Sequence, residues 1–145
     1  MVIRNAAKSQ SASSLLHEAR LFLPECYNGA QQWQNAANAH EGAVRENPAD
    51  AQILNGAAWF YATTKSALRN PRKALDYANR ANSAAPDNPD FVDTLAEAYF
   101  VNGRIASAIA TEQKALALAP DRKDLQKDME KYTRAQRAVQ AKKTQ

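Results

Sequence analysis

The chain has 145 residues, with 45% hydrophobic and 23% charged side chains, which fits one globular domain with a core of its own. A single cysteine excludes an internal disulfide, and no apolar run reaches the roughly 20 residues that a membrane-spanning helix needs. The net charge of +4 belongs to residues 121–145, which carry eight basic and four acidic side chains, while the rest of the chain is balanced.

The first segment, 1–10, is polar without a clear period and predicts a flexible N-terminus. Apolar residues then recur at helical spacing over 11–23, and Pro24, followed by Asn28 and Gly29, predicts the end of this first helix. No stretch of this region is hydrophobic enough for a signal peptide, which favours a cytoplasmic protein. A mature periplasmic form, or a domain cut from a longer protein, would have the same features.

Residues that cap or interrupt helices mark the second, third and fourth predicted helices and the start of the fifth. The second predicted helix covers 30–46, and the third runs from a cap at Asp50 to about Lys65. The fourth and fifth begin after Asn70 and Asn88. Each of these asparagines precedes a proline, which fits the first helical position because no N–H is needed there.

The last part of the chain predicts the end of the fifth helix and two more helices. Gly103 ends the fifth helix, Pro120 ends the sixth, and Asp121 caps the seventh. The seventh carries one apolar stripe, formed by Leu125, Met129, Tyr132 and Val139. No segment shows the alternation of apolar and polar residues that is typical of a strand. The chain is therefore predicted to be all-α, with about seven helices.

Two stretches of the chain are copies of one pattern. The segment KALDYANRANSAAP at 73–86 matches SAIATEQKALALAP at 107–120 at a separation of 34 residues. Two alanines, one aliphatic residue and the closing proline recur at the same positions in both. A fixed period of this length indicates a solenoid of helix pairs.

One unit of this pattern, residues 89–120, carries a fuller set of matching residues. They are Leu95, Ala96, Tyr99, Gly103, Ala108, Ala115 and Pro120. With these residues the unit resembles a tetratricopeptide repeat. Residues 51–86 match the same pattern with four extra residues in the turn near Thr64–Arg69. Glu112 departs from the pattern, because the family often has an aromatic residue at that place.

The resemblance implies a right-handed α-solenoid of antiparallel helix pairs with about three repeats. The repeats would cover residues 11–48, 49–86 and 87–120, of which the first matches least well. Residues 121–145 would then form a capping helix and a basic tail. Small alanines at helical spacing allow neighbouring helices to approach closely, and larger leucine, tyrosine and tryptophan side chains fill the space between pairs.

In this family the first helices of the pairs line a concave surface that binds partners. The resemblance therefore implies a partner-binding groove at Asn55, Trp59, Asp90, Asp93, Glu97 and Phe100. We expect an acidic rim with exposed aromatic rings at Trp59 and Phe100. Such a groove suits a partner protein or peptide with basic and apolar residues.

Two alternatives to this groove stay open. A helix face with acidic residues is often only a solvated face, and the aromatic rings could pack under a neighbouring helix. Some family members hold a C-terminal carboxylate with a clamp of Lys, Asn and Arg. Asn55 matches one position of that clamp, but Asp93 places an acid at the corresponding position of the next unit, so we expect no carboxylate clamp.

The sequence predicts neither a metal site nor a cofactor nor a catalytic site. His17, His40 and Cys26 lack the spacing of zinc ligands, and four scattered glycines do not form a phosphate-binding loop. The basic tail is expected to be a solvated capping helix, with contact to nucleic acid or to an anionic membrane as the alternative.

The predicted function is a non-enzymatic protein–protein interaction scaffold of tetratricopeptide-like repeats. One alternative is a small chaperone for a secreted or assembled protein. Another is the regulatory or targeting domain of a larger enzyme or membrane complex. The partner's identity and the oligomeric state do not follow from the sequence.

Overall fold

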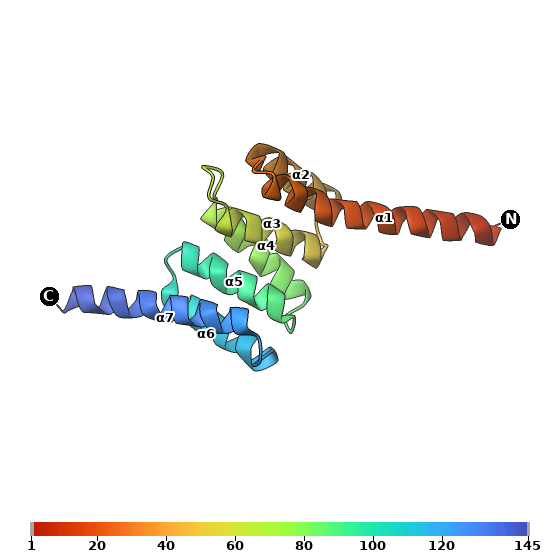
Figure 1. Cartoon of the computed structure of the whole chain (residues 1–145). Helices are drawn as coiled ribbons and strands as arrows, with labels where there is room; N and C mark the ends of the chain where they lie inside the picture. The colour runs from red at the N-terminus through yellow and green to blue at the C-terminus, as the bar shows by residue number, and fades with distance from the viewer. Residues whose placement is uncertain (1, 145) are drawn as a thin grey trace.

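The structure is a computed structural model that describes residues 2–144, with side chains from residue 12 onward. Seven α-helices follow one another along the chain (Figure 1). They are α1 (Val2–Gly29), α2 (Trp33–Glu46), α3 (Ala51–Thr63), α4 (Pro71–Ala84), α5 (Pro89–Val101), α6 (Ile105–Leu118) and α7 (Lys123–Lys143). Within residues 2–144 every regular element is a helix, which confirms the all-α prediction.

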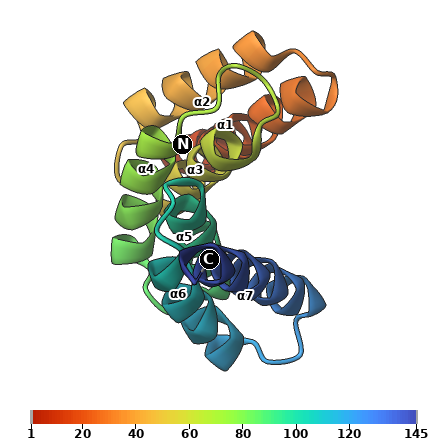
Figure 2. The same ribbon diagram turned by 90° about the vertical axis from the view of Figure 1, so that its left-hand side faces the viewer.

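The helices form an arc of antiparallel pairs. The pairs α1/α2, α3/α4 and α5/α6 stack in sequence order, and α7 packs against α6 at the end. Figure 2 shows α1, α3, α5 and α7 on the inner side of the arc and α2, α4 and α6 on the outer side. This arrangement confirms the predicted α-solenoid of helix pairs.

Local side-chain bonds explain where most helices begin. Asp50 Oδ1 accepts hydrogen bonds from the backbone N–H groups of residues 52 and 53, both at 3.0 Å. Asn70 and Asn88 each accept one such bond at 3.0 Å, and a proline follows each of them at the first helical position. These three caps are confirmed. The predicted cap at Asp121 is wrong, because Arg122 occupies the N-cap position of α7 and makes no side-chain capping bond there.

The turn between α5 and α6 depends on its glycine. Gly103 has a φ of 75°, a left-handed conformation that side chains with a Cβ rarely adopt. The backbone N–H of Gly103 donates to the carbonyl of Phe100 at 2.9 Å, and that of Arg104 donates to the carbonyl of Tyr99 at 3.0 Å. This local bonding reverses the chain and sets α6 against α5.

The first helix differs from the prediction at both ends. It begins at Val2, so it includes most of the segment that was predicted to be a flexible N-terminus. It also continues through Pro24 to Gly29, although proline removes a backbone hydrogen bond from a helix. The Pro24 ring is fully buried, and this apolar packing offsets the lost bond.

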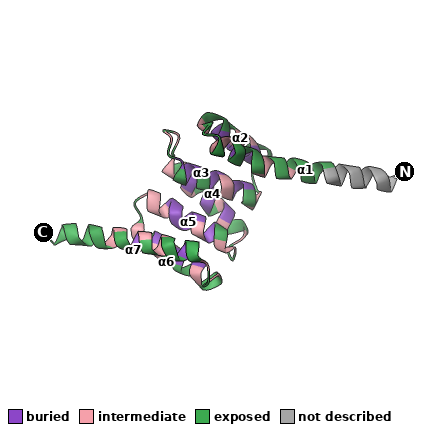
Figure 3. Cartoon of the chain, viewed as in Figure 1, coloured by how far each residue is buried: buried purple, intermediate pink, exposed green. Residues whose placement is uncertain are grey.

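Buried alanines form the seams between neighbouring helices. The alanines with no exposed surface are Ala36, Ala57, Ala58, Ala62, Ala74, Ala78, Ala81, Ala96, Ala98, Ala108 and Ala115. Larger buried side chains, such as those of Leu54, Tyr61 and Phe91, fill the space between the pairs. Figure 3 shows that this core runs through the middle of the arc and thins out along the projecting part of α7.

A hydrogen-bonded carboxylate fastens the first pair to the second. Glu41 of α2 accepts hydrogen bonds from Tyr61 OH at 2.6 Å, from Lys73 Nζ at 2.7 Å and from Tyr77 OH at 3.0 Å. Burial alone would raise the pKa of Glu41, but the bonds from Lys73, Tyr61 and Tyr77 outweigh it and hold the pKa below its usual value. Three helices are thereby joined at one charged group.

We expect Glu41→Ala to lower the free energy of unfolding by about 2 kcal/mol, because two tyrosine hydroxyls and one ammonium lose their acceptor. Urea unfolding followed by circular dichroism measures this change. A lowered carboxyl pKa stabilises the fold above the ordinary pKa and loses that effect as the pH falls. The difference between the two proteins should therefore shrink below about pH 4. Glu18→Ala removes an exposed carboxylate from α1 and should leave the stability unchanged.

Candidate functional site

The inner surface is the face of the arc formed by α1, α3, α5 and α7 (Figure 2). Helix α3 lies at its centre, because α1, α2, α4 and α5 cover the other sides of this helix. The side chains of α3 that stay open can therefore lie only on the inner surface. They are the exposed Gln52, Trp59 and Thr63 and the half-buried Asn55.

Trp59 and Asn55 lie one helical turn apart on this face of α3. The Trp59 side chain is 38% exposed, and it is one of the few large apolar side chains outside α1 that stay open to solvent. Asn55 is half-buried, and its buried Oδ1 atom has no hydrogen-bond partner among the residues that the structure describes. The Trp59 ring is thus exposed, as predicted, whereas its part in a partner-binding groove stays a prediction.

Helix α7 covers two of the predicted groove residues on α5. Glu97 is only 7% exposed and accepts hydrogen bonds from Tyr132 OH at 2.7 Å and from Lys131 Nζ at 2.6 Å. The ring of Phe100 lies 4.8 Å, centre to centre, from the ring of Tyr132. The prediction that Glu97 lies on an acidic rim and that Phe100 is an exposed ring is therefore wrong.

The covering of Glu97 and Phe100 results from the position of α7, which docks as the first helix of a further unit would. Its apolar residues Leu125 and Tyr132 are completely buried against α5 and α6, whereas Val139 is 43% exposed. Burial raises the pKa of the Tyr132 hydroxyl well above its usual value, and the charge of Glu97 raises it further. The Tyr132 hydroxyl therefore stays protonated and donates to Glu97.

Asp93 is another of the predicted groove acids. Its side chain points between helices, toward a second carboxyl group. Asp93 is half-buried and faces Glu112 of α6, which has no exposed surface. Burial raises the pKa of Glu112 to about 9, and the charge of Asp93 adds to this shift. Burial also raises the pKa of Asp93, together with the charge of Asp128. Glu112 is therefore protonated near neutral pH, and Asp93 does not form an open rim.

Asp90 is the one predicted acid of α5 that is well exposed. Its carboxylate lies 2.8 Å from Arg122, which also binds Asp124 at 2.6 Å. The hydrogen bond from Arg122 lowers the pKa of Asp124 to about 2. Two carboxylates thus share one guanidinium at this end of the inner surface. These three groups together keep one net negative charge.

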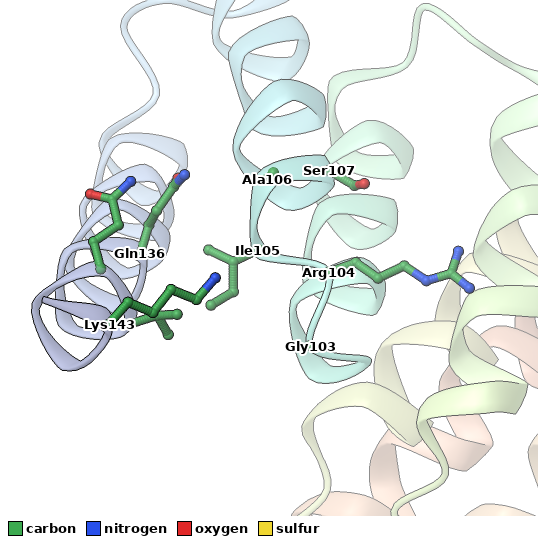
Figure 4. Close-up of a pocket in the computed structure, with 9 residues that line it drawn as sticks. Gly103, Arg104, Ile105, Ala106, Ser107, Gln136 and Lys143 are labelled. Atoms are coloured by element: carbon green, nitrogen blue, oxygen red, sulfur yellow. The ribbon is translucent and has the colours of Figure 1, made fainter.

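A separate open pocket of about 490 Å³ lies between the start of α6 and the end of α7 (Figure 4). Its lining includes Ile105, Ser107 and Gln136, with the basic residues Arg104 and Lys143 at its edge. Figure 4 shows the Arg104 side chain directed away from Lys143. The two basic groups do not converge, so the pocket has no obvious place for an anion.

The candidate metal ligands lie apart. His40 is buried beside Phe60, with ring centres 5.0 Å apart, and burial lowers its pKa to about 4. His17 Nδ1 lies 3.4 Å from a carboxylate oxygen of Asp50, and Cys26 is exposed. Among the residues that the structure describes, no three His, Cys, Asp or Glu side chains gather as a metal site would require. Over the same residues, no helix combines the length and the apolar character needed to cross a bilayer.

Comparisons with solved structures agree on one fold. No protein-family model matches the sequence, and no curated protein matches it. The first TPR domain of human RPAP3 is similar with a TM-score of 0.74 at 14% identity, over 86% of this chain and 95% of that domain. The Sgt2 TPR domain from Aspergillus fumigatus is similar with a TM-score of 0.74 at 16% identity, over 86% of this chain and 82% of that domain.

A third similar structure contains a bound peptide. It is the first TPR of Spaghetti (RPAP3) bound to the HSP90 peptide SRMEEVD, with a TM-score of 0.70 at 14% identity, over 82% of this chain and 91% of that one. Together the three similarities show that the chain has the tetratricopeptide-repeat fold.

Proposed function

We propose that this chain is a non-enzymatic protein-interaction scaffold that binds a peptide or a helix of another protein on its inner surface. The observation that carries the proposal is the exposure of Trp59 at the centre of that surface. Large aromatic side chains at such positions are frequent energetic centres of protein contacts. The bound peptide in the similar Spaghetti domain supports a peptide as the partner.

The proposed binding site centres on α3, with Asn55 and Trp59 as its main residues. The Asn55 amide can donate a hydrogen bond from Nδ2, which suits a backbone carbonyl of an extended peptide, while its Oδ1 atom is buried. The Trp59 ring offers an apolar contact one turn away. Of the acids on α5, Asp90 is the one most open to a partner, while Asp93, Glu97 and Phe100 support the site from beneath α7.

The charge of the inner surface favours a partner with basic and apolar residues. Asp90 is the exposed acid of α5 at this surface, and Arg122 offsets its charge only in part because the same guanidinium also pairs with Asp124. An acidic C-terminal peptide would find no basic side chain on α3 and would meet the exposed carboxylate of Asp90 on α5. We therefore expect the peptide SRMEEVD not to bind this chain.

We expect Trp59→Ala to weaken binding of the natural partner by about 30-fold, as loss of an aromatic anchor usually does. Immobilised wild-type and variant chains would capture partners from the native cell, and quantitative mass spectrometry would compare them. Leu118→Ala is the matched control, because Leu118 is 40% exposed on the outer helix α6. Capture of the same proteins in the same amounts by Trp59→Ala, with unchanged circular dichroism, would rule out binding at this ring.

Two other functions would use the same surface. A small chaperone for a secreted or assembled protein would capture one major client, whereas the regulatory domain of a larger enzyme or membrane complex would capture subunits of that complex. The identity of the captured proteins separates these cases. The cytoplasmic location stays a prediction from the sequence, and binding of nucleic acid through the basic tail stays the alternative for residues 121–145.

A further inference from the structure

Helix α1 carries an apolar stripe that the residues with described side chains, 12–144, leave exposed. The stripe consists of Ala12, Leu15, Leu16, Ala19, Phe22, Leu23 and Cys26, all of which are exposed. The four large side chains are 66% (Leu15), 51% (Leu16), 66% (Phe22) and 49% (Leu23) exposed. Four of the seven large hydrophobic side chains exposed in the described part of the chain thus lie on this one helix face.

The opposite face of α1 makes the contacts with the rest of the domain. His17 lies near Asp50, Arg20 forms an ion pair with Glu46, and Pro24 is buried. Leu21 and Tyr27 of the same face pack against the core beside the buried Pro24. The apolar side chains of the stripe are thus additional to the ones that hold α1 on the domain, and an apolar patch of this size on the open face of a helix indicates that the stripe has a partner.

The two ends of the solenoid differ in this respect. At the C-terminal end, α7 buries Leu125 and Tyr132 and exposes mainly charged side chains, as a capping helix should. At the N-terminal end, α1 exposes the apolar stripe. Stacked repeats need a polar outer face at each end for solubility, and the outer face of α1 is not polar.

The apolar surface continues beyond the stripe into a groove of about 250 Å³ between α1 and α2. Leu16, Ala19 and Leu23 belong to both the stripe and the groove, and Ala39 and Gly42 of α2 form the far wall. Because these two residues are small, the groove leaves room for side chains from outside the chain.

We propose that a second copy of this chain covers the apolar stripe, so that two copies pair through antiparallel α1 helices with the twofold axis at Ala19. A twofold interface requires a surface that is complementary to itself. The stripe has this property, because its positions are symmetric about Ala19. Leu16 and Phe22 lie three residues on either side, Leu15 and Leu23 four, and Ala12 and Cys26 seven.

The sizes of the side chains suit this arrangement. The small Ala19 lies at the axis, where the two helices must approach each other most closely. On one side of the seam between the helices, Leu15 of one copy packs against Phe22 of the other. On the opposite side of the seam, Leu16 of one copy packs against Leu23 of the other. None of the seven stripe residues is charged, and Glu18 and Glu25 lie exposed beside the stripe, so the pairing buries no unpaired charge.

The exposed area agrees with a reversible dimer. The four large side chains expose on the order of 450 Å² per copy, which is as large as the biggest apolar patch of a typical monomer. Two copies with their flanking residues approach about 1,200 Å², the lower limit for stable interfaces. A dimer in this range dissociates at micromolar concentrations. In the dimer, the α7 helix of each copy forms one of the two outer ends.

Sedimentation of the full chain over a range of micromolar concentrations tests the dimer. We expect a mass that rises from one copy to two copies. Leu15→Glu combined with Phe22→Glu should keep the chain monomeric at every concentration, with unchanged circular dichroism. The matched control is Leu118→Glu with Val139→Glu, at positions that are 40% and 43% exposed elsewhere, and this variant should still dimerise. Trp59→Ala should also dimerise, since its ring lies on the inner surface.

Cysteine crosslinking tests the direction of the helices. In the proposed pairing the two Cys26 residues lie about 21 Å apart along the helices, so the wild-type chain should not form an interchain disulfide. A variant with Ala19→Cys and Cys26→Ser should form one under mild oxidation. A disulfide through the wild-type Cys26 would indicate parallel helices and overturn the arrangement. A wild-type chain that is monomeric at all concentrations, or a dimer that survives both glutamates, would overturn the proposal. So would a monomer whose stripe holds a different protein.

Discussion

Tyr132→Ala is expected to lower the free energy of unfolding by about 4 kcal/mol, the largest loss that we expect from a single substitution in this chain. Tyr132 is completely buried and is the largest of the fully buried side chains. Its removal leaves a cavity between α5 and α7 and deprives Phe100 of its stacking partner. It also removes a hydrogen bond from Glu97, whose carboxylate is buried and keeps only Lys131.

Two further variants separate the cavity from the hydrogen bond. Tyr132→Phe keeps the ring and removes the hydroxyl, so it should lower the stability by only about 1–2 kcal/mol. Glu97→Gln added to Tyr132→Phe should recover part of this loss, since a neutral amide tolerates the missing donor better than a carboxylate does. Urea unfolding followed by circular dichroism gives each value. Val139→Ala is the control on the exposed part of α7 and should have no effect.

Hydrogen exchange identifies the helices that lose stability in Tyr132→Ala. If α7 holds α5 in place, Tyr132→Ala should speed exchange of the amides in α5 and α6 while those of α2 stay protected. Stability equal to that of the wild type, with unchanged exchange in α5, would mean that α7 does not cover Glu97 and Phe100 in solution. The inner surface would then extend over α5, as the sequence alone predicted.

Glu112→Gln is expected to stabilise the protein at alkaline pH, by several kcal/mol at pH 8. Glu112 has an ordinary pKa of 4.5 when the chain is unfolded, and the fold raises that pKa to about 9. Between these two values the folded chain binds more protons than the unfolded chain. The stability of the wild type therefore falls as the pH rises through this window. Glutamine carries no ionisable group, so the variant avoids this loss.

The pH profile distinguishes this effect from ordinary repacking. Thermal and urea unfolding are measured at pH 5, 6.5, 8 and 9. The wild type and Glu112→Gln should have nearly equal stabilities at pH 5, and the difference between them should grow as the pH rises. The glutamine amide can donate to Asp93, so the buried polar group keeps a neighbour of suitable chemistry. Glu130→Gln, at an exposed position of α7, is the matched control and should follow the wild type. Parallel profiles for wild type and Glu112→Gln would show that Glu112 holds no extra proton.

The positions where helices begin were predictable because the forces that set them are local. Asp50, Asn70 and Asn88 bond to backbone groups two or three residues ahead, and the prolines that follow the asparagines act within one turn. The passage of α1 through Pro24 was not predictable, since the burial of its ring depends on how α1 packs against the neighbouring helix α2. Local rules place a helix end there, and tertiary packing overrides them.

The site was predictable only in part because exposure depends on where α7 docks. The repeat pattern places Trp59 and Glu97 at equivalent positions, but only Glu97 is covered. One sequence signal was overlooked. The period of 34 residues that relates the last two repeats also relates Glu97 to Lys131, so a residue of opposite charge stands one period further on. Treating 121–145 as the first helix of another unit, rather than as a distant cap, would have predicted that contact.

Glu112 was visible from the sequence as a departure from the aromatic residue common at that place in the family. Its chemical consequence was not, because the pKa of a carboxyl group depends on burial and on the distance to Asp93 across two helices. A change in residue type can be read from one sequence, whereas a pair of carboxyl groups facing each other requires the packed structure.

The nearest-neighbour stacking of the helices has a consequence for how quickly the native state is reached. Substantial contacts join helices that are one or two places apart along the chain, so no long loop has to close before a contact forms. The α3/α4 pair, with a side-chain cap at the start of each helix, can serve as a nucleus, and the other helices can add to it from either side. Low contact order of this kind places the folding time in the microsecond to millisecond range.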